Sequence, residues 1–336
     1  MNGKNLMKIS KQELLKEAVE TGFRPEIMEK VWHLMAILDG INVHPLLKDR
    51  LVLKGGTALN LFFFDLPRLS VDIDLNYIGK RDRQEMLLER PEIERALEAI
   101  FQREGLSIRR IPEKHAGGKW QLRYESALGG NGNLEVDLNF MFRTPLYPIN
   151  KQCSHRIGTR KTKEIALLDI HELGAGKLSA LFGRHASRDL FDAHQLLTKC
   201  SLNAEQLRLA SLVYGAMGSK DWRQISIDEL HFDEKELKDQ LIPVLRKHLL
   251  RNDDWLGWTN QLLSDCKAAL KPLFPLRERE RAFLQSIFEG GKIEATLLTD
   301  DHELIQTINA HPLLQWKAKL VYESNQKYQR SKITKN

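Results

Sequence analysis

The chain has 336 residues, of which 42% are hydrophobic and 29% are charged, so it is long enough for two domains with a substantial core. No apolar run approaches the length of a membrane span, and residues 1–10 have too few apolar side chains for a signal peptide, which predicts a cytoplasmic protein without a membrane partner. Lysine and arginine number 51 against 45 aspartate and glutamate residues, and this net charge of +6 favours a polyanionic partner, although many ordinary proteins are equally basic.

Capping signals and hydrophobic periodicity predict the elements of the first half of the chain. Ser10 and Glu13 form a capping-box pattern that opens the first helix. The predicted elements, in chain order, are helices at 10–20 and 26–38, a strand at 51–54, a helix from residue 57, a strand at 68–77, a helix at 91–104, and a hairpin of strands 120–126 and 134–142. Glycine-rich residues 129–132 join the two strands of this hairpin.

From residue 165 onward, the spacing of apolar residues predicts almost only helices. Breaks between these helices are expected near residues 183, 218, 252, 272–275 and 290–291. The pattern therefore predicts an α/β (α+β) fold with a mixed sheet and a larger C-terminal α-helical domain. Its expected parts are an N-terminal helical segment, a sheet-containing catalytic domain, a helical domain and a basic tail, at residues 1–44, 45–160, 161–326 and 327–336.

A glycine turn precedes the strand at 68–77. Gly55 and Gly56 allow positive φ angles and a close approach of the backbone to a ligand. Thr57 would begin a helix, where free amides, the positive end of the helix dipole and the threonine hydroxyl can bind a phosphate. Taken alone, such a turn is more often a loop with an N-cap residue.

The strand at 68–77 alternates polar and apolar residues without a break. Asp72 and Asp74 therefore project from one face, about 6.6 Å apart at about 3.3 Å per residue. Two carboxylates at this spacing can share a divalent-cation site, and they repel each other without a cation. The alternative is an amphipathic strand whose polar face meets water. The preceding glycine turn favours phosphoryl chemistry over that alternative.

The second strand of the hairpin offers a third carboxylate, because Glu135, Asp137 and Asn139 share one of its faces. If this strand pairs beside the strand of Asp72, three carboxylates converge. Such an arrangement suits two Mg²⁺ ions about 3.5 to 4 Å apart. The alternation leaves open whether Glu135 or Asp137 is the third ligand, and a solvent-facing acidic edge is the alternative.

These motifs resemble those of the nucleotidyltransferase superfamily, and in particular the AbiEii toxins of type IV toxin-antitoxin and abortive-infection systems, to which the MenT toxins are related. The likeness rests on residues 55–57 (GGT) and on the Arg-x-Ser-x-Asp-Ile-Asp-Leu pattern of residues 68–75. Residues 136–139 (VDLN) resemble the third, single-aspartate strand of the superfamily, which favours Asp137 over Glu135. Later segments resemble the family's Lys and Arg-Asp-x-x-Asp segments, at residues 177–181 (KLSAL) with Arg184 and at 188–192 (RDLFD).

The resemblance implies roles for particular residues. Expected catalytic residues are Asp72, Asp74, Lys177 and Asp192; expected nucleotide-binding residues are Gly55, Gly56, Thr57, Lys177 and Arg188; expected metal ligands are Asp72, Asp74 and Asp137. A helix lysine is otherwise usually a solvated charge. If the helix of Lys177 persists through Gly183, Arg184 and Arg188 fall near the same stripe and can neutralise phosphate. Asp189 and Asp192 share a helix face and can orient Lys177 or these arginines; for Asp189 a structural ion pair with Arg188 is the favoured alternative. The site should therefore lie in the cleft between the two domains.

Basic residues concentrate in three places, at residues 109–110, 151–163 and 327–335. The middle cluster lies between the strand of Asp137 and the helix of Lys177, so we expect it near the site, where a nucleic-acid strand could lie; a solvated loop is the alternative. The cysteines are widely spaced and odd in number, which predicts neither a disulfide framework nor a zinc site: Cys153, Cys200 and Cys266.

Together with the resemblance, these features imply a Mg²⁺-dependent nucleotidyltransferase, with Mn²⁺ as an alternative metal. It is expected to transfer a nucleoside monophosphate from a nucleoside triphosphate to RNA, with the 3′ end of a tRNA as acceptor and a cognate antitoxin protein as partner. An enzyme that modifies a protein or a small molecule such as an antibiotic is the first alternative. The others are a non-catalytic nucleic-acid-binding protein and a partner-binding protein that uses aromatic residues of the helical domain, Trp255, Trp258, Phe274 and Trp316.

Overall fold

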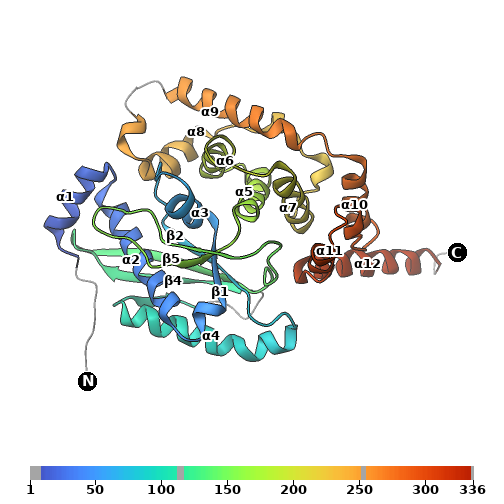
Figure 1. The fold of residues 1–336 in the computed structure, drawn as a ribbon, viewed down its shortest axis with the longest axis horizontal. Helices are drawn as coiled ribbons and strands as arrows, with labels where there is room; N and C mark the ends of the chain where they lie inside the picture. Colours follow the sequence, from blue (N-terminus) through green and yellow to red (C-terminus); the bar gives the residue numbers. More distant parts are fainter. Residues whose placement is uncertain (1–8, 112–116, 251–254, 334–336) are drawn as a thin grey trace.

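The computed structural model describes residues 9–111, 117–250 and 255–333, which form a mixed sheet with a large helical region beside it (Figure 1). The expected α/β (α+β) fold is thus confirmed. Most of residues 1–10, the expected break near residue 252 and the last three residues lie outside the described ranges. Within these ranges, no helix combines the length and the apolar character that crossing a bilayer requires.

Among the described residues, seven strands form one sheet in the order β3-β4-β5-β2-β1-β7-β6. Their bounds are β1 Leu51–Lys54, β2 Asp72–Tyr77, β3 Ser107–Arg110, β4 Gly117–Glu125, β5 Asn131–Asn139, β6 Asn150–Gln152 and β7 Ile165–Leu167. The pairs β2–β5 and β1–β7 are parallel, and the other neighbouring pairs are antiparallel. The predicted short strand β1 and the predicted hairpin of β4 and β5 are therefore present.

The strand that carries the two aspartates is shorter than predicted. β2 begins at Asp72, whereas Arg68 makes only an isolated bridge with Leu245, and the Leu69 N–H donates to the carbonyl of Val244. The alternating residues before Asp72 therefore belong to a connecting segment. Arg68 does not join the polar face of the sheet, since its side chain is buried on the way to the helical region.

The apolar face of the sheet packs against helices of the first hundred residues. Ser10 caps the first of them by accepting a hydrogen bond from the Glu13 N–H, as the capping box predicts. One core contains Trp32, Leu97 of the helix Arg83–Arg103 and Val136 of β5. The N-terminal helical segment thus shares its core with the sheet. The helices are α1 Lys11–Thr21, α2 Pro25–Val43 and α4 Arg83–Arg103.

Helix α4 begins earlier than the predicted start at Pro91. The Asp82 side chain accepts the backbone N–H groups two and three positions ahead of it and caps the helix there. Met86 and Ile93, on either side of Pro91, are both buried on the face toward the core. Burial of this face holds the helix together across the proline, which lacks the N–H of a regular helix position.

The helical region has its own core, with Phe182, Val213 and Phe283 at its centre. Its helices are α5 Ile170–Arg184, α6 Ser187–Lys199, α7 Ala204–Met217, α8 Glu234–Glu236, α9 Trp255–Leu270, α10 Glu278–Phe288, α11 His302–Asn309 and α12 Pro312–Ile333. Shorter 3₁₀ turns lie at Leu47–Asp49, Trp222–Gln224, Ile227–Glu229, Ile242–Val244, Lys247–Leu250, Lys271–Leu273 and Ala295–Leu297, with π-helical turns at Leu59–Phe63 and Leu237–Leu241. Most predicted breaks coincide with helix ends, but α5 runs through Gly183 and ends at Arg184.

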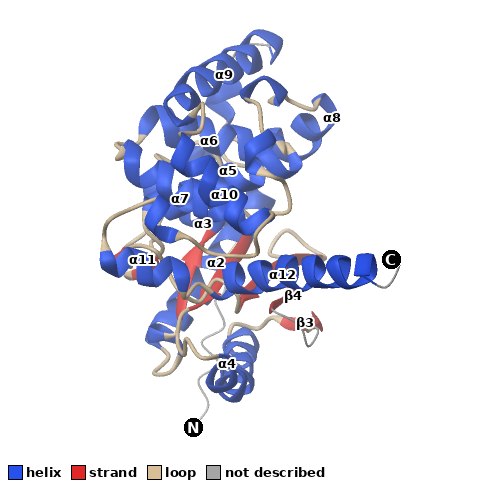
Figure 2. Cartoon of the chain, turned by 90° about the vertical axis from the view of Figure 1, so that its right-hand side faces the viewer, coloured by secondary structure: helices blue, strands red, loops and turns tan. Residues whose placement is uncertain are grey.

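The long last helix α12 extends outward from the helical region (Figure 2). It continues through Ile333, so residues 327–333 extend a helix and do not form the separate tail that we expected. Trp316 on this helix is 52% exposed. Trp255, Trp258 and Phe274 instead contact other aromatic rings of the helical region.

The junction between sheet and helical region lies later than residue 160. β7 pairs with both β1 and β6, so residues 165–167, expected to be helical, complete the sheet. Helix α5 begins at Ile170 directly afterwards. We therefore place the junction after Leu167. Helices α5 and α6 then lie beside the ends of β1 and β2, next to the short helix α3 Gly55–Ala58 (Figure 1).

Candidate active site between the sheet and the helical region

The predicted glycine turn connects β1 directly to α3, which continues as the π-helical turn Leu59–Phe63. Gly55 has a φ of +75°, and a Cβ atom there would collide with the carboxylate of Asp74. A Cβ on Gly56 would stand 3.0 Å from Nη2 of Arg68. A larger residue would therefore be crowded at both positions, and at Gly55 it would also need a left-handed backbone.

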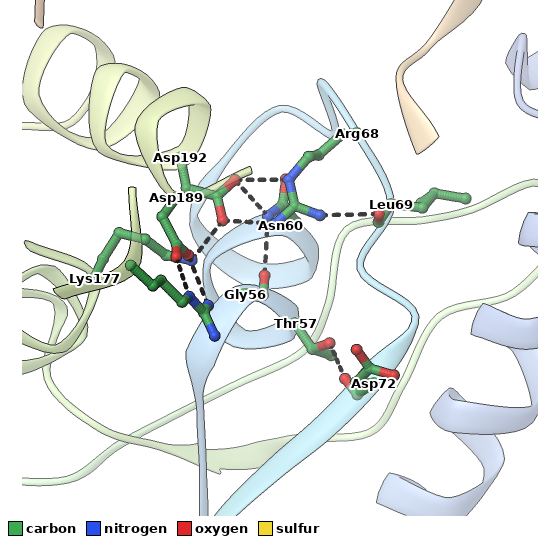
Figure 3. Close-up of polar contacts among 10 residues, drawn as sticks. Gly56, Thr57, Asn60, Arg68, Leu69, Asp72, Lys177, Asp189 and Asp192 are labelled. Carbon is green, nitrogen blue, oxygen red and sulfur yellow. Dashed lines mark hydrogen bonds and ion pairs between the residues drawn. The ribbon is translucent and has the colours of Figure 1, made fainter. Parts of the chain in front are cut away.

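The Thr57 hydroxyl is engaged within the fold. Its side chain is fully buried, and its hydroxyl donates a hydrogen bond to the backbone carbonyl of Asp72. The hydroxyl proton is therefore already used in a bond within the protein. It ties the start of α3 to the first residue of β2, so that the glycine turn and the aspartates keep a fixed relation (Figure 3).

The structure brings the predicted carboxylates to one face of the sheet. In the parallel pairing of β2 with β5, Asp74 stands opposite Asp137 and Asp72 stands opposite Glu135. Neighbouring strands lie about 4.8 Å apart, so these side chains are within reach of one another. Glu135 is engaged elsewhere, since Lys119 contacts its carboxylate at 2.7 Å. Asp137 is thus the better placed of the two candidates for the third carboxylate.

Electrostatics distinguishes these carboxylates from ordinary surface acids. Burial, and then the charges of Asp74 and Glu135, raise the pKa of Asp72. Burial, and then the charge of Asp74, likewise raise the pKa of Asp137. The fold thus holds like charges together at a partly buried place, and a bound cation would relieve their repulsion.

The donor set fits a hard divalent cation, because it consists of carboxylate oxygens on adjacent strands. Asp74 is held against Gly55, where any larger residue would occupy its place. In the parts of the chain that the structure describes, no three His, Cys, Asp or Glu side chains converge as a formed metal-binding group. The residues that would hold the cation are Asp72, Asp74 and Asp137.

Asp192 on α6 lies at the centre of a buried ionic cluster that joins the two parts of the protein (Figure 3). Arg68 donates to its two oxygens at 2.7 and 2.6 Å, and the Lys177 ammonium lies 2.9 Å away. Asn60 donates to the same carboxylate at 3.2 Å and to the carbonyl of Gly56 at 2.9 Å. The relative exposures of Asp192, Arg68 and Lys177 are 0%, 2% and 8%.

Asp189, one turn earlier on α6, completes this cluster. It contacts Lys177 at 2.7 Å and Arg184 at 2.6 Å. Burial alone would raise the pKa of Asp192, but the charges of Arg68 and Lys177 outweigh burial and lower it. Burial alone would lower the pKa of Lys177, but the two aspartates raise it. Asp192 and Lys177 are therefore both charged at neutral pH.

Arg184 and Arg188 do not form one helical stripe with Lys177. Helix α5 ends at Arg184, and His185 takes a left-handed conformation with φ of 53°, so Arg188 lies on the next helix. From there its charge lowers the pKa of Asp72, against the larger effect of burial. Arg184 is 67% exposed while it contacts Asp189. Both arginines still lie beside the site, from different elements.

The basic residues 151–163 are not positioned over the carboxylates as we expected. Arg160 stacks on Trp32 of α2, at 4.2 Å from the ring centroid. Thr159 donates to Glu17 of α1, and the Lys163 N–H donates to Asp39 of α2. Residues 159–163 therefore pack on the N-terminal helices. The first half of the segment instead bonds to the turn Leu59–Phe63, through Gln152 and His155.

The sequence profile of the nucleotidyl transferase AbiEii toxin, type IV toxin-antitoxin system, matches residues 36–271. The chain belongs to the AbiEii family. Its fold is similar to that of MenT4, a nucleotidyltransferase toxin from Mycobacterium tuberculosis H37Rv, with a TM-score of 0.61 and 14% sequence identity over 90% of this chain and 98% of that chain. No curated protein matches the chain. The family resemblance of the motifs is thus confirmed.

Three residues at the site of this AbiEii protein were not identified from its sequence. Arg68 is the first residue of the Arg-x-Ser-x-Asp-Ile-Asp-Leu pattern. Alternation with the residues that follow predicts only that its side chain lies on the polar face of the strand. Asn60 was detectable as the one polar residue in the apolar run 58–64. Lys54 pairs in register with Asp74, and its ammonium lies 5.3 Å from the ring centroid of Phe142.

A cavity of about 450 Å³ opens between the sheet and the helical region. One part of its lining is charged or glycine, and includes Lys54, Gly55, Gly56, Asp74, Lys177 and Arg184. The other part is largely aromatic and apolar, and includes Phe142, Leu173, Tyr214, Met217 and Trp222. A larger cavity, about 820 Å³, lies between α7, α10 and α11, but the described residues that line it include none of these site residues. The smaller cavity therefore belongs to the site.

Glu172 is buried in the wall of the smaller cavity. Its carboxylate accepts the N–H groups of Leu146 and Tyr147 at 2.8 and 2.9 Å and the Tyr214 hydroxyl at 2.9 Å. Burial raises the pKa of Glu172 to about 7, although these hydrogen bonds oppose the shift. Glu172 thus fixes the segment before β6 and the aromatic wall of the cavity to α5.

Replacing Gly55 by alanine tests the packing of the turn against Asp74. Gly55→Ala should lower stability more than Gly130→Ala, which also adds a side chain at φ of +75° but meets no atom within 4 Å. The shared cost of the left-handed conformation is about 1–2 kcal/mol. Urea unfolding of both variants measures the difference. Equal losses would mean that the Asp74 contact does not constrain residue 55.

Asp192→Asn should destabilise the protein by about 3–5 kcal/mol, because Arg68 and Lys177 stay buried without their shared carboxylate. Asp65→Asn, at an exposed position between α3 and β2, is the control and should cost little. Adding Arg68→Met to Asp192→Asn should restore part of the loss, since one unpaired cation is removed. Strictly additive losses in the double variant, measured by urea unfolding, would contradict this coupling.

Glu172 should make stability fall as pH rises. In the unfolded chain its carboxyl loses the proton near pH 4.5, but in the folded protein it does so only near pH 7. The folded state binds more protons between these values, so this contribution is complete below pH 4.5 and is lost by about pH 7. Urea unfolding across this window should give a flatter pH dependence for Glu172→Gln. An unchanged slope would show that another group titrates.

Proposed function

We propose that this AbiEii-family protein transfers a nucleoside monophosphate from a nucleoside triphosphate to an RNA acceptor. One observation carries the proposal. Asp74 and Asp137 stand opposite each other beside the glycine turn, where the cavity opens next to Lys177. Metal-binding carboxylates, an anion-binding turn and a buried cation are the groups that phosphoryl transfer from a nucleotide requires.

The nucleoside triphosphate occupies the 450 Å³ cavity in this proposal. Its phosphates lie at the charged part, near the amides of Gly55 and Gly56, and its base lies among the aromatic side chains. Lys177 contacts Asp189 and Asp192, and because an ammonium has three N–H donors, one remains for a phosphate oxygen. The two aspartates thereby orient Lys177 toward the nucleotide.

Asp72, Asp74 and Asp137 would hold Mg²⁺, or Mn²⁺ in its place. Bound there, the cation supplies positive charge to the phosphates and makes the acceptor hydroxyl more acidic. Arg188, whose charge already acts on Asp72, adds further positive charge from α6. Lys177 and Arg184 do the same from α5.

The reaction is a displacement at the α-phosphorus of the nucleotide. The hydroxyl oxygen of the acceptor forms a bond to this phosphorus, the bond to the bridging β-phosphate oxygen breaks, and pyrophosphate leaves with the electron pair. The hydroxyl proton passes to a neighbouring carboxylate. Asp137 is the candidate for this part, because it stands opposite Asp74 within the carboxylate group. Positioning of the two substrates supplies much of the rate enhancement.

We further propose that the acceptor is the 3′ end of a tRNA and that a cognate antitoxin protein restrains the activity. Membership of a type IV toxin-antitoxin family supports the antitoxin. The net charge of +6 supports a polyanionic acceptor. Expression without the antitoxin should then arrest growth.

The test is transfer of label from each nucleoside triphosphate to total tRNA in the presence of Mg²⁺. Label should appear in the RNA, and Asp72→Asn, Asp74→Asn or Asp137→Asn should lower the rate by about a hundredfold or more, since each removes a group that acts in the transition state. Glu135→Gln should retain most activity, because Lys119 already engages that carboxylate. Asp65→Asn is the control for an exposed acid.

The outcomes separate the acceptor from the chemistry. Label in a protein or a small molecule, lost in Asp74→Asn, would keep the transferase and overturn the RNA acceptor. Equal losses in Glu135→Gln and Asp137→Asn would contradict the choice of Asp137. Full activity of Asp74→Asn, with its fold verified by thermal unfolding, would overturn the proposed site altogether.

A further inference from the structure

The polar face of the sheet does not end at the carboxylates but continues across β5 onto β4 and β3. Asp72 stands opposite Glu135, which stands opposite Gln121. Two residues further along the same strands, Asn133 pairs with Arg123. Because paired residues in a sheet share a face, all these side chains point to the side that carries the aspartates.

This outer part of the polar face is open. Lys119, Gln121 and Asn133 are exposed, whereas the alternate residues of the same strands, such as Trp120 and Leu134, are buried on the opposite face. Helix α4 covers that opposite face, where Phe101 packs on Trp120. A flexible polyanion can therefore lie flat across β4 and β5 without displacing any helix.

A depression of about 410 Å³ lies on this open face, lined by Arg109, Arg123, Asn131 and Asn133. Among the described residues, neither the Arg109 nor the Arg123 guanidinium has an ion pair or a hydrogen bond. Glu125, which pairs with Asn131, is an acidic residue at the end of β4 and marks the limit of this basic and amide surface. Two guanidinium groups and two amides suit a sugar-phosphate backbone. A guanidinium group can donate two hydrogen bonds to one phosphate, and amides donate to phosphate and sugar oxygens.

We propose that this depression binds a backbone phosphate of the acceptor RNA, a few nucleotides from the hydroxyl that reacts. Arg123 is on β4, two strands away from Asp72 on β2, which corresponds to about 10 Å across the sheet. It is also two residues beyond the position that aligns with Asp72, which adds about 7 Å along the strand direction. A single strand that leaves the carboxylates over Glu135 and Lys119 reaches it directly. The proposal rests on the proposed function for the identity of the acceptor alone. It places an RNA surface outside the basic segment 151–163.

The test compares two double charge reversals on opposite faces of the sheet. Arg109→Glu/Arg123→Glu removes the depression's cations, and Arg83→Glu/Arg95→Glu makes the same change of charge on exposed positions of α4. Binding of total tRNA whose 3′ end has been blocked by periodate oxidation is measured over a range of salt concentrations. Transfer to intact tRNA is measured in parallel, and thermal unfolding verifies the fold of each variant.

We expect the sheet-face reversal to weaken RNA binding and to raise the KM for RNA by about tenfold or more, while the KM for the nucleotide is unchanged. The slope of the logarithm of affinity against the logarithm of salt concentration should become shallower by about 0.7 for each phosphate that the variant no longer binds. The α4 reversal should alter neither binding nor KM by more than about twofold. Equal effects of the two reversals would overturn the proposal.

The two proposals fail in different ways. If wild type binds blocked tRNA through the sheet face but transfers no nucleotide to RNA, the proposed function falls and the RNA surface stands. If transfer is intact and the sheet-face reversal has no effect on binding, the RNA surface falls and the proposed function stands. If wild type does not bind tRNA at all, both fall.

Discussion

The rest of the site depends on the buried ion pairs that the Asp192 carboxylate forms with Arg68 and Lys177. This carboxylate is fully buried on α6, and its two oxygens accept bonds from Arg68, which precedes β2, and contact Lys177 on α5. Asn60 links the same carboxylate to the backbone of the glycine turn. One side chain thus fixes the turn, the entry to the aspartate strand and the helical region relative to one another.

The charge of this cluster also has a part in the proposed function. Arg68, Lys177 and Arg184 carry three positive charges against the two negative charges of Asp189 and Asp192, a net charge of one positive beside the cavity. A buried ionic group is often no more stable than apolar residues of similar volume. In the proposed function its value lies in its field, because a positive charge fixed beside the cavity attracts the phosphates of the nucleotide.

The local parts of this site were predictable from the sequence, because they depend on neighbours in the chain. Alternation placed Asp72 with Asp74 and Asp137 with Glu135, and the pairing of β2 with β5 brings those two sets together. The role of Arg68 was not predictable, since its partner lies 124 residues away. The same holds for the Thr57 hydroxyl, which bonds a carbonyl 15 residues later. Periodicity predicts on which face of an element a side chain lies, but it does not predict which distant residue will contact that side chain.

Register also explains why the connection between β2 and β5 matters. Parallel strands cannot be joined by a short hairpin, so the chain must cross over before it can place Asp137 beside Asp74. Here the crossover contains α4, β3 and β4, and β4 then pairs with β5 as a hairpin. A slip of one residue would turn Asp137 to the apolar face. The hairpin and the helix that bury that face therefore set the position of the third carboxylate, and the same hairpin extends the polar face outward to Arg123.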